Sequence, residues 1–315
     1  MTKIAYIFPG QGSQAVGMGQ NLCSHSKAAR TVFDEADMLI GTKLSSLCFY
    51  GPEESLKQTI YAQLALFVTS VAALRVLQEV DAPPPEAVAG HSVGEYAALY
   101  AAEAIDFQTG IHLVERRAQE MHRAALAAPG TMAAVLGLSS INVVEACAEA
   151  EAAGAGVVQA ANFNGGRQVV ISGTAKGVAR ASDIAKLKGA KRVIPLNVSG
   201  AFHSKLMTPA VEAMEYALKD AQIQPATIPI VANLTADYER DSELIKTNLA
   251  GQIDHPVRWE ETIGRLSEDG FETFVEVGAG TVLGGLIRRI APEARIFSVA
   301  DMAGLEKFLE SERQP

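Results

Sequence analysis

One serine stands in a setting that favours nucleophilic chemistry. Residues 90–94 read Gly-His-Ser-Val-Gly, after an apolar, strand-like run at 87–89 and before a helix-forming run at 95–104. A serine at a sharp strand-to-helix turn is held out from the sheet beside backbone N–H groups, and the turn is too tight for a Cβ at either glycine. Many chains contain this pentapeptide by chance, but the strand-turn-helix context predicts that Ser92 is a nucleophile.

A serine hydroxyl needs a base within hydrogen-bond reach, and the chain has six histidines. His203 differs from the others because it lies in a loop of small residues, 198–204, between a predicted strand and a predicted helix. Folds of this kind place catalytic residues in such loops. His91 adjoins the serine, but its side chain should point away at a tight turn and pack. His203 is therefore the candidate base, and a packed loop histidine is the alternative.

A third group usually orients such a histidine. No acidic residue stands out for this role in the second half of the chain. Asp254 and Glu276 are formal candidates, although Asp254 suits the turn before His255 better. A carbonyl oxygen could orient the histidine instead, and the sequence leaves this choice open.

An arginine falls on the apolar side of a helix predicted at 107–128. Four apolar residues recur there at helical spacing, namely Leu113, Val114, Met121 and Ala125. Arg117 lies within their stripe, and an inward guanidinium is costly unless a carboxylate meets it. The partner could be an acid of the protein, or it could be the carboxylate of a substrate bound in bidentate fashion.

A glycine-rich loop follows the first predicted strand. Residues 8–14 read Phe-Pro-Gly-Gln-Gly-Ser-Gln, without the Lys-Ser/Thr of a phosphate-binding loop, so they are weak support for a nucleotide site. A loop of this kind can instead direct a backbone N–H at an oxyanion.

The elements that must position these residues alternate between strand-like and helical runs along most of the chain. Such alternation predicts a mainly parallel sheet with helices on both faces. The stretch from 131 to 197 has a βαββαβ order, which is the ferredoxin-like pattern, with an Asn-Gly-Gly turn suited to a hairpin. Its expected elements are a strand at 132–138, a helix at 142–153, strands at 157–162 and 168–172, a helix at 175–188 and a strand at 192–196.

We therefore expect an α/β chain in two parts. Residues 1–128 and 198–315 would form the larger core, and residues 129–197 would form a small subdomain inserted into it. Gly130 and the Ser-Gly pair at 199–200 would serve as hinges.

Composition limits the classes of function. The 315 residues are 48% hydrophobic and 20% charged, which is ordinary for a globular α/β protein, and the formal net charge of −9 disfavours a nucleic-acid partner. The start lacks a signal peptide's apolar stretch, and the most apolar helix, near 64–77, is interrupted by polar residues, so we expect a core helix and no membrane partner. Three scattered cysteines without metal-like spacing indicate buried residues, no metal site and a cytoplasmic location.

Together these segments resemble the malonyl-CoA:acyl carrier protein transacylase family of fatty-acid synthesis. The likeness covers nearly the whole chain, from about residue 3 to residue 300, and several ordered motifs carry it. They are Pro-Gly-Gln-Gly-Ser-Gln at 9–14, Gly-His-Ser-Val-Gly-Glu-Tyr at 90–96, Arg117, Gly-Thr-Met-Ala-Ala at 130–134, Asn-Phe-Asn at 162–164, Gly-Ala-Phe-His-Ser at 200–204, Pro-Val-Arg-Trp at 256–259 and Glu-Val-Gly-Ala-Gly at 276–280. The resemblance implies an α/β-hydrolase-like core with an inserted ferredoxin-like subdomain.

The resemblance also implies roles for the residues that react. Ser92 would be the acylated nucleophile and His203 its base. The backbone N–H groups of Gln11 and Val93 would form the oxyanion hole.

Four more residues gain a role by the same resemblance. Arg117 would bind the free carboxylate of the malonyl group, and the backbone carbonyl of Gln252 would orient the histidine. Gln63 and Phe202 would line the pocket, where the wide ring of Phe202 leaves less room for an α-methyl branch.

The implied reaction is a ping-pong transfer of malonyl from malonyl-CoA to the phosphopantetheine thiol of acyl carrier protein, for type II fatty-acid synthesis. No metal or redox cofactor is needed, the carrier protein would bind transiently, and we expect a monomer. Because carrier proteins of the family are acidic, a local basic patch would dock them. That patch would consist either of Lys186, Lys188, Lys191 and Arg192, or of Arg288 and Arg289.

Three alternatives remain at this point. A trans-acting malonyl transferase of polyketide assembly would share the chemistry and use another carrier. A serine hydrolase or thioesterase of the same fold would not need the carboxylate grip of Arg117. A catalytically silent scaffold for carrier proteins would not need both Ser92 and His203.

Overall fold

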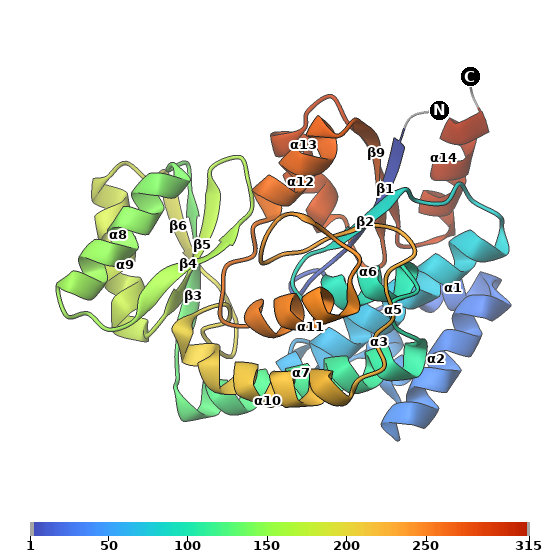
Figure 1. Cartoon of the computed structure of the whole chain (residues 1–315), viewed down its shortest axis with the longest axis horizontal. Helices are drawn as coiled ribbons and strands as arrows, with labels where there is room; N and C mark the ends of the chain where they lie inside the picture. The colour runs from blue at the N-terminus through green and yellow to red at the C-terminus, as the bar shows by residue number, and fades with distance from the viewer. Residues whose placement is uncertain (1–2, 314–315) are drawn as a thin grey trace.

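The computed structural model describes residues 3–313, which form two separate sheets with helices packed around them (Figure 1). The strands of the larger sheet are β1 (Lys3–Phe8), β2 (Ala87–Gly90), β7 (Ile230–Val231), β8 (Tyr238–Glu239), β9 (Phe271–Val277) and β10 (Arg295–Val299). They lie in the order β10-β9-β1-β2-β7-β8, and every pair is parallel except β7 with β8. The prediction of a mainly parallel sheet is confirmed.

Side chains of the larger sheet alternate between its two faces, as the two-residue period of a strand requires. In β1, Tyr6 and Phe8 belong to one hydrophobic core, whereas Ala5 and Ile7 belong to a second core on the opposite face. Both faces are covered, so a continuous apolar run is needed to make this strand.

Helices from both halves of the chain cover one face of the larger sheet and contribute to the larger core. They are α1 (Gln20–His25), α2 (Lys27–Ile40), α3 (Leu44–Tyr50), α4 (Glu53–Leu56), α5 (Thr59–Glu79), α6 (Gly94–Ala101), α7 (Phe107–Ala127), the short 3-10 helix η1 (Lys205–Met207), α10 (Thr208–Asp220), α11 (Ser242–Gly251) and α14 (Met302–Arg313). The opposite face packs against α12 (Trp259–Glu268) and α13 (Val282–Ile290).

The most apolar helix is α5, which is long and apolar enough to cross a membrane by length and composition alone. It is buried along most of its length within the larger core, and the polar side chains of Gln63, Thr69 and Ser70 are buried with it. The prediction of a buried core helix in this region is confirmed.

The smaller sheet consists of four strands with antiparallel pairing, in the order β4-β5-β3-β6. Its elements follow the expected βαββαβ order: β3 (Thr131–Leu136), α8 (Ser140–Ala152), β4 (Val158–Phe163), β5 (Gln168–Gly173), α9 (Ala175–Leu187) and β6 (Arg192–Pro195). The strand expected at 132–138 ends two residues earlier, because Gly137 takes a φ of 83° that a regular strand does not allow.

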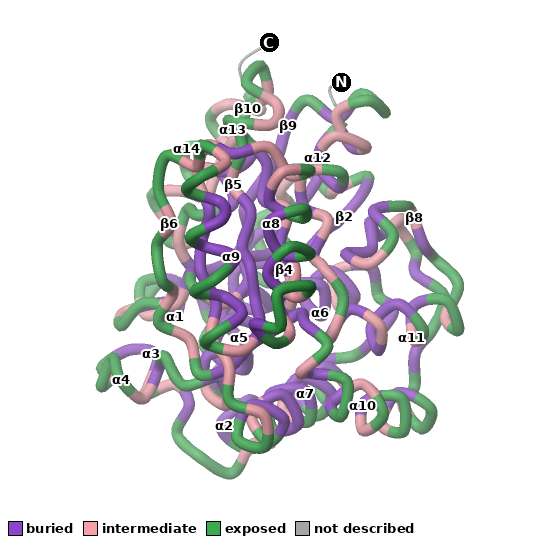
Figure 2. The backbone as a smooth tube through the Cα atoms, turned by 90° about the vertical axis from the view of Figure 1, so that its left-hand side faces the viewer, coloured by how far each residue is buried: buried purple, intermediate pink, exposed green. Residues whose placement is uncertain are grey.

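The two faces of the smaller sheet meet different surroundings. Ala133 and Val135 pack under α8 and α9, which cover the outer face (Figure 2). Met132 and Ala134 point the other way and join the larger core. The inner face therefore closes one side of the space between the two sheets.

The Pro-Val-Arg-Trp segment at 256–259 ties the two sheets together. Phe163 N donates to the carbonyl oxygen of Val257, and Val257 N donates to the carbonyl oxygen of Ala161, both at 2.9 Å. Val257 and Trp259 are fully buried. Strand β4 is thus fixed to the larger part of the chain by backbone hydrogen bonds.

Candidate functional site

The turn between β2 and α6 holds Ser92 at a φ of 54°, in the left-handed region that residues with a side chain rarely adopt. A Cβ added to Gly90 would lie 2.0 Å from the carbonyl carbon of Gly94, and one added to Gly94 would lie 2.2 Å from the carbonyl oxygen of Phe8. Both positions therefore require glycine, as the sequence predicts.

A cavity of about 450 Å³ lies in front of this turn. The inner face of the smaller sheet lines it with Met132 and Ala134, and α13 lines it with Leu283 and Leu286. Seven of the predicted site residues also line it, namely Gln11, Gln63, Ser92, Val93, Arg117, Phe202 and His203. The eighth, Gln252, is fully buried and bonds to members of this set.

Ser92 and His203 are 111 residues apart in sequence and form a hydrogen bond of 2.7 Å between Oγ and Nε2. Nδ1 of the histidine lies 2.8 Å from the backbone carbonyl oxygen of Gln252. A carbonyl can only accept, so Nδ1 carries the proton and Nε2 is free to accept the serine proton. Burial, assisted by the Arg117 charge, lowers the pKa of His203 to about 3, which keeps the imidazole neutral and able to act as a base.

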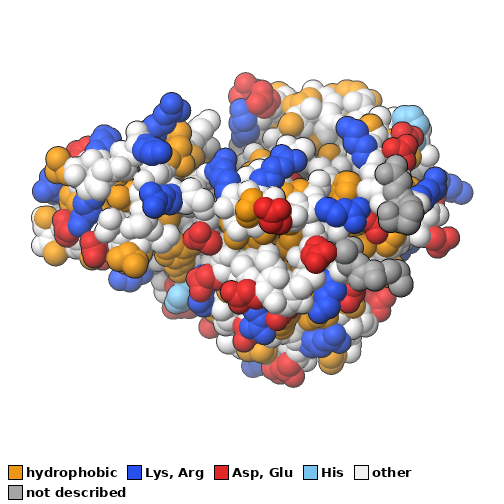
Figure 3. Space-filling view, turned by 90° about the horizontal axis from the view of Figure 1, so that it is seen from above, with side chains coloured by type: hydrophobic (Ala, Val, Ile, Leu, Met, Phe, Trp, Pro, Cys, Tyr) orange, Lys and Arg blue, Asp and Glu red, His pale blue; other side chains and the backbone are white. Residues whose placement is uncertain are grey.

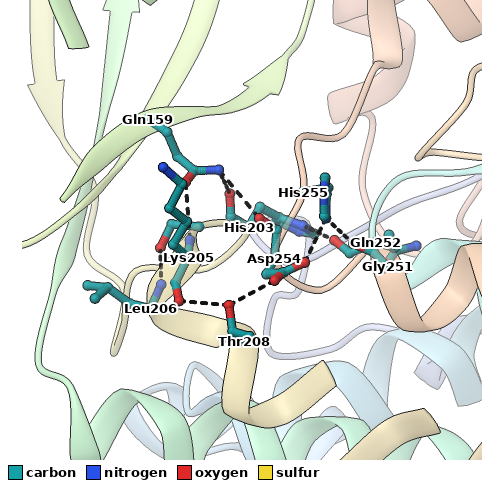
Figure 4. Close-up of polar contacts among 10 residues, drawn as sticks. Gln159, His203, Lys205, Leu206, Thr208, Gly251, Gln252, Asp254 and His255 are labelled. Carbon is teal, nitrogen blue, oxygen red and sulfur yellow. Dashed lines mark hydrogen bonds and ion pairs between the residues drawn. The ribbon is translucent and has the colours of Figure 1, made fainter. Parts of the chain in front are cut away.

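The histidine loop is held by a set of polar contacts (Figure 4). His203 has a φ of 56°, so both members of the pair have left-handed backbones. Nε2 of Gln159, on β4, donates to the carbonyl oxygens of His203 and Asp254 at 3.4 Å each, and its Oε1 accepts from Lys205 N at 3.1 Å. The smaller sheet thereby fixes the histidine loop against the segment after Gln252.

Neither acidic candidate contacts the histidine. Asp254 accepts from Thr208 Oγ1 at 2.9 Å and lies 2.6 Å from Nδ1 of the neighbouring His255. Glu276 accepts from the backbone N–H groups of Leu283 and Gly284 at 3.0 and 2.8 Å, and so caps the start of α13. The residue patterns left three possible partners for His203 Nδ1, namely Asp254, Glu276 or a carbonyl oxygen. In the structure that partner is the backbone carbonyl oxygen of Gln252.

Arg117 is 1% exposed, and its terminal nitrogens point toward the nucleophile. Nη1 donates to Gln63 Oε1 at 2.6 Å, and Nη2 donates to Ser92 Oγ at 3.0 Å and to Gln252 Oε1 at 2.8 Å. These acceptors are neutral, and between residues 3 and 313 no carboxylate forms an ion pair with this guanidinium. The alternative of a direct ion pair with a protein acid is therefore wrong, and the site is suited to an anionic group supplied by a ligand.

Two backbone N–H groups next to Ser92 are unused. Within the part of the chain that the structure describes, neither Gln11 N nor Val93 N donates a hydrogen bond. Ser92 N instead donates to Asn233 Oδ1 at 2.7 Å. The loop of Gln11 lies against the turn, since a Cβ on Gly10 would be 2.3 Å from the carbonyl oxygen of His91. This pair of donors can stabilise an oxyanion.

One buried polar residue at this turn, Asn233, was not singled out from the sequence. Asn233 donates from Nδ2 to the carbonyl oxygen of Gly90 at 2.6 Å, and its place just after β7, a parallel strand of the larger sheet, is a signal that could have identified it. His91 donates from Nε2 to Asn164 Oδ1 at 2.9 Å and packs its ring 5.4 Å from that of Trp259. As predicted, His91 packs, and its ring nitrogen Nε2 bonds Asn164 rather than Ser92.

The same part of the chain, residues 3–313, holds no group of three or more His, Cys, Asp or Glu side chains that could bind a metal ion. The three cysteines are all buried and unpaired within it, as expected from the sequence, and burial raises the pKa of each thiol.

Comparison with known proteins gives one consistent result. Residues 5–307 match the family described as the acyl transferase domain. The malonyl CoA-acyl carrier protein transacylase of Bacillus subtilis is 44% identical over 311 residues, which cover 99% of this chain and 98% of that protein.

Solved structures show the same similarity. An acyl carrier protein S-malonyltransferase from Vibrio cholerae matches with a TM-score of 0.93 and 41% identity, over 97% of this chain and 99% of the other. A malonyl-transacylase in complex with its type II PKS acyl-carrier protein matches with a TM-score of 0.95 and 39% identity, over 98% of this chain and 100% of the other.

Proposed function

This chain belongs to the acyl transferase family, among the malonyl CoA-acyl carrier protein transacylases, and we propose that Ser92 carries the malonyl group that it transfers. It is an [acyl-carrier-protein] S-malonyltransferase, which moves malonyl from malonyl-CoA to acyl carrier protein. The observation that carries the proposal is the position of Arg117, buried and 3.0 Å from Ser92 Oγ. In a malonyl thioester one methylene carbon joins the free carboxylate to the reacting carbonyl, so the group that binds the carboxylate must lie beside the nucleophile.

In the first half-reaction Ser92 Oγ attacks the thioester carbonyl of malonyl-CoA, and His203 Nε2 takes the hydroxyl proton. The N–H groups of Gln11 and Val93 stabilise the negative oxygen of the tetrahedral intermediate. The intermediate collapses with cleavage of the carbon–sulfur bond, and CoA leaves as the thiol after taking the proton from His203. Malonyl remains as an ester on Ser92, with its carboxylate on Arg117.

In the second half-reaction the phosphopantetheine thiol of acyl carrier protein attacks this ester and gives its proton to His203. The oxyanion hole is used again, the ester bond breaks, and Ser92 Oγ recovers the proton from the imidazole. The buried Arg117 holds the malonyl group in one orientation, which favours the thiol over water. Phe202 lines the same cavity, and its ring limits space for a branch at the α-carbon.

The experiment that tests this proposal is the intact mass of the protein after exposure to malonyl-CoA. The wild type should gain one malonyl group, peptide mapping should place it on Ser92, and addition of carrier protein should remove it with formation of malonyl-carrier. S92A should gain nothing. A malonyl adduct at full occupancy in S92A would refute the assigned nucleophile.

Of the two basic patches, we propose that Arg288 and Arg289 dock the acidic carrier protein. Lys186 already contacts Asp183 at 3.1 Å, and Lys188 contacts two glutamates of α8, at 3.1 and 2.9 Å. Arg289 instead bonds the neutral Gln168 Oε1 at 2.8 Å, and Gln168 lines the cavity. Basic side chains gather on both sides of the hollow between the smaller lobe and the rest of the molecule (Figure 3).

Charge reversal tests this surface in the second half-reaction, started from isolated malonyl-enzyme so that CoA does not interfere. R288E/R289E should raise the KM for carrier protein by about tenfold at low salt, and the difference should shrink as salt rises. K186E/K188E is the matched control and should change little. An unchanged KM in R288E/R289E would exclude this patch, and parallel assays with fatty-acid and polyketide carriers would show which carrier is preferred.

We also propose that the enzyme acts as a cytoplasmic monomer, and that its reaction uses malonyl-CoA and carrier protein without a resident metal or redox group. Light scattering should give the mass of a single chain. Activity should survive dialysis against a chelator, because a serine nucleophile with a histidine base needs no metal.

A further inference from the structure

A buried carboxylate lies behind the nucleophile and outside the reaction described above. Glu95 is on α6, three residues after Ser92, and is fully buried. Its Oε2 accepts from Gln252 Nε2 at 2.7 Å and from the backbone N–H of Asn233 at 3.2 Å. This one oxygen atom therefore connects α6 to two other segments, the end of α11 at Gln252 and the segment after β7 at Asn233.

Gln252 connects Glu95 to both groups that act on the substrate. Its side-chain Oε1 accepts from Arg117 Nη2 at 2.8 Å, and its backbone oxygen accepts from His203 Nδ1 at 2.8 Å. A guanidinium can only donate and a carboxylate accepts, so the amide of Gln252 has one permitted orientation, with Oε1 toward Arg117 and Nε2 toward Glu95. Nε2 also donates to the backbone carbonyl oxygen of Ser92 at 3.1 Å. Without Glu95, that longer hydrogen bond alone would oppose a rotation of the amide that places an NH₂ group against the guanidinium.

Asn233 connects Glu95 to the nucleophile itself. While its backbone N–H is held by Glu95, its side chain accepts from Ser92 N at 2.7 Å and donates to the carbonyl oxygen of Gly90 at 2.6 Å. The left-handed backbone of Ser92 needs such support, because a strained conformation persists only where its surroundings fix it.

The carboxyl group of Glu95 also stands near the charge of Arg117 without contacting it, since the Gln252 amide lies between them. The guanidinium thus remains available to a substrate carboxylate. Burial, together with the nearby Glu239, raises the pKa of Glu95. Its Oε2 can accept both hydrogen bonds in either protonation state, because Oε1 makes no hydrogen bond within residues 3–313 and can carry the proton.

We propose that Glu95 is a positioning residue for malonyl transfer, which aligns His203 and Arg117 through Gln252 and holds Ser92 through Asn233. The inference rests on the proposed function, because it assumes that Ser92 is acylated while Arg117 binds the malonyl carboxylate. It assigns no contact between Glu95 and the substrate.

The test compares E95A and E95Q in the rate of Ser92 acylation, by rapid quench and intact mass, with malonyl-CoA and with acetyl-CoA. E95A leaves two buried N–H groups without an acceptor and leaves the Gln252 amide held only by the Ser92 carbonyl oxygen, so malonyl transfer should fall by about 100-fold. Acetyl transfer should fall by a smaller factor, because acetyl has no carboxylate to be met by Arg117. E95Q keeps an acceptor oxygen and should stay within about fivefold of the wild type with both substrates.

The matched control is E239Q. Glu239 is also a buried carboxyl with a raised pKa, but it accepts from Asn248 Nδ2 and bonds neither Gln252 nor Asn233. This variant should keep both rates. If E95A were acylated as fast as the wild type, if its malonyl and acetyl rates fell by one common factor, or if E239Q were equally slow, a positioning role for Glu95 would be wrong.

Should E95A fail to fold, E95D replaces it, because its carboxyl group is chemically the same and is one methylene too short for both donors. A malonyl-selective loss in E95D supports the inference, and wild-type rates overturn it. Failure of the proposed function is distinguishable, because the wild type would then form no adduct on Ser92 at all.

Discussion

At the scale of single residues, the site contains a buried cation whose hydrogen-bond partners among residues 3–313 are neutral. Arg117 bonds Gln63, Ser92 and Gln252, none of which carries a charge. Within the described residues 3–313, its desolvation is therefore not compensated by a direct ion pair, and the malonyl carboxylate would supply the missing anion. An esterase acting on neutral esters would have no use for such a group.

Removing this cation should separate two substrates. R117A should lower acylation by malonyl-CoA by about 100-fold or more, since truncating one partner of a buried charged pair costs about 2–5 kcal/mol. Acetyl-CoA should react at nearly the wild-type rate, and R117K should be intermediate because it keeps the charge and loses the two-pronged geometry. Single-turnover rates with both thioesters provide the measurement, and equal losses for the two would contradict the carboxylate assignment.

The low pKa of His203 predicts an unusual pH profile. A base whose pKa is about 3 stays unprotonated on acidification, so acylation should not fall near pH 6.5, where an ordinary histidine is protonated. The free energy of unfolding should respond to pH even though the rate does not. His203 binds a proton more readily in the unfolded chain, so its contribution to stability is full above pH 6.5 and is lost as the pH falls toward 3. Rate and urea unfolding measured from pH 8 to pH 5 test both, and a rate that halves near pH 6.5 would disprove the first.

At the scale of elements, α7 sets the position of Arg117. The helix starts at a defined residue, because Asp106 Oδ1 accepts from Thr109 N at 2.7 Å and caps it. The polar side of the same helix is held by Arg116 and Arg123, which both contact Glu120 at 3.1 and 3.0 Å. The apolar side of the helix packs against the core. Arg117, ten residues after the first helical residue Phe107, lies on that side and therefore faces the interior.

The cap of α7 can be tested by replacement. D106A should lower the free energy of unfolding by about 1 kcal/mol, while D106N should change it little because asparagine caps equally well. The Thr109 N–H lowers the pKa of Asp106, so the contribution of its charge is present above the unfolded pKa and declines as pH falls. Urea unfolding at pH 7 measures the difference, and equal stability of D106A and wild type would show that this cap is unimportant.

At the scale of the whole molecule, we propose that residues 129–197 form an inserted subdomain that depends on the rest of the chain. Its helices cover a hydrophobic cluster of their own, but the inner face of its sheet, with Met132 and Val170, belongs to the larger core. Backbone hydrogen bonds at Val257 tie β4 to the larger part. Gly200, one of the expected hinges, is packed closely, since a Cβ there would lie 2.5 Å from Ala125 Cβ.

This shared core predicts one cooperative unfolding transition. Separation of the subdomain would expose apolar surface on both parts, and this exposure costs a free energy of about 25 cal/mol for each Å². Calorimetry should therefore give a ratio of calorimetric to van't Hoff enthalpy near one. Two resolved transitions would mean that the subdomain unfolds by itself.

The sequence by itself determined the features that are encoded within a few neighbouring residues. The glycines around Ser92, the inward Arg117 of α7 and the βαββαβ order at 131–197 all follow from turn sterics and from helix and strand periods. These patterns are local, so they can be recognised without knowledge of the fold. Ser92 and His203 could be paired as candidates by chemistry alone.

Only the tertiary structure decided how these parts meet. The group that orients His203 is a backbone carbonyl, which every residue has, so no side-chain pattern marks Gln252 for that role. Glu95 and Asn233 lie 138 residues apart and join only after β7 has paired beside β2. Whether a basic residue is free or already paired likewise depends on which acids the fold brings near it, as at Lys188. Contacts between distant segments are set by packing, and packing is a property of the whole fold.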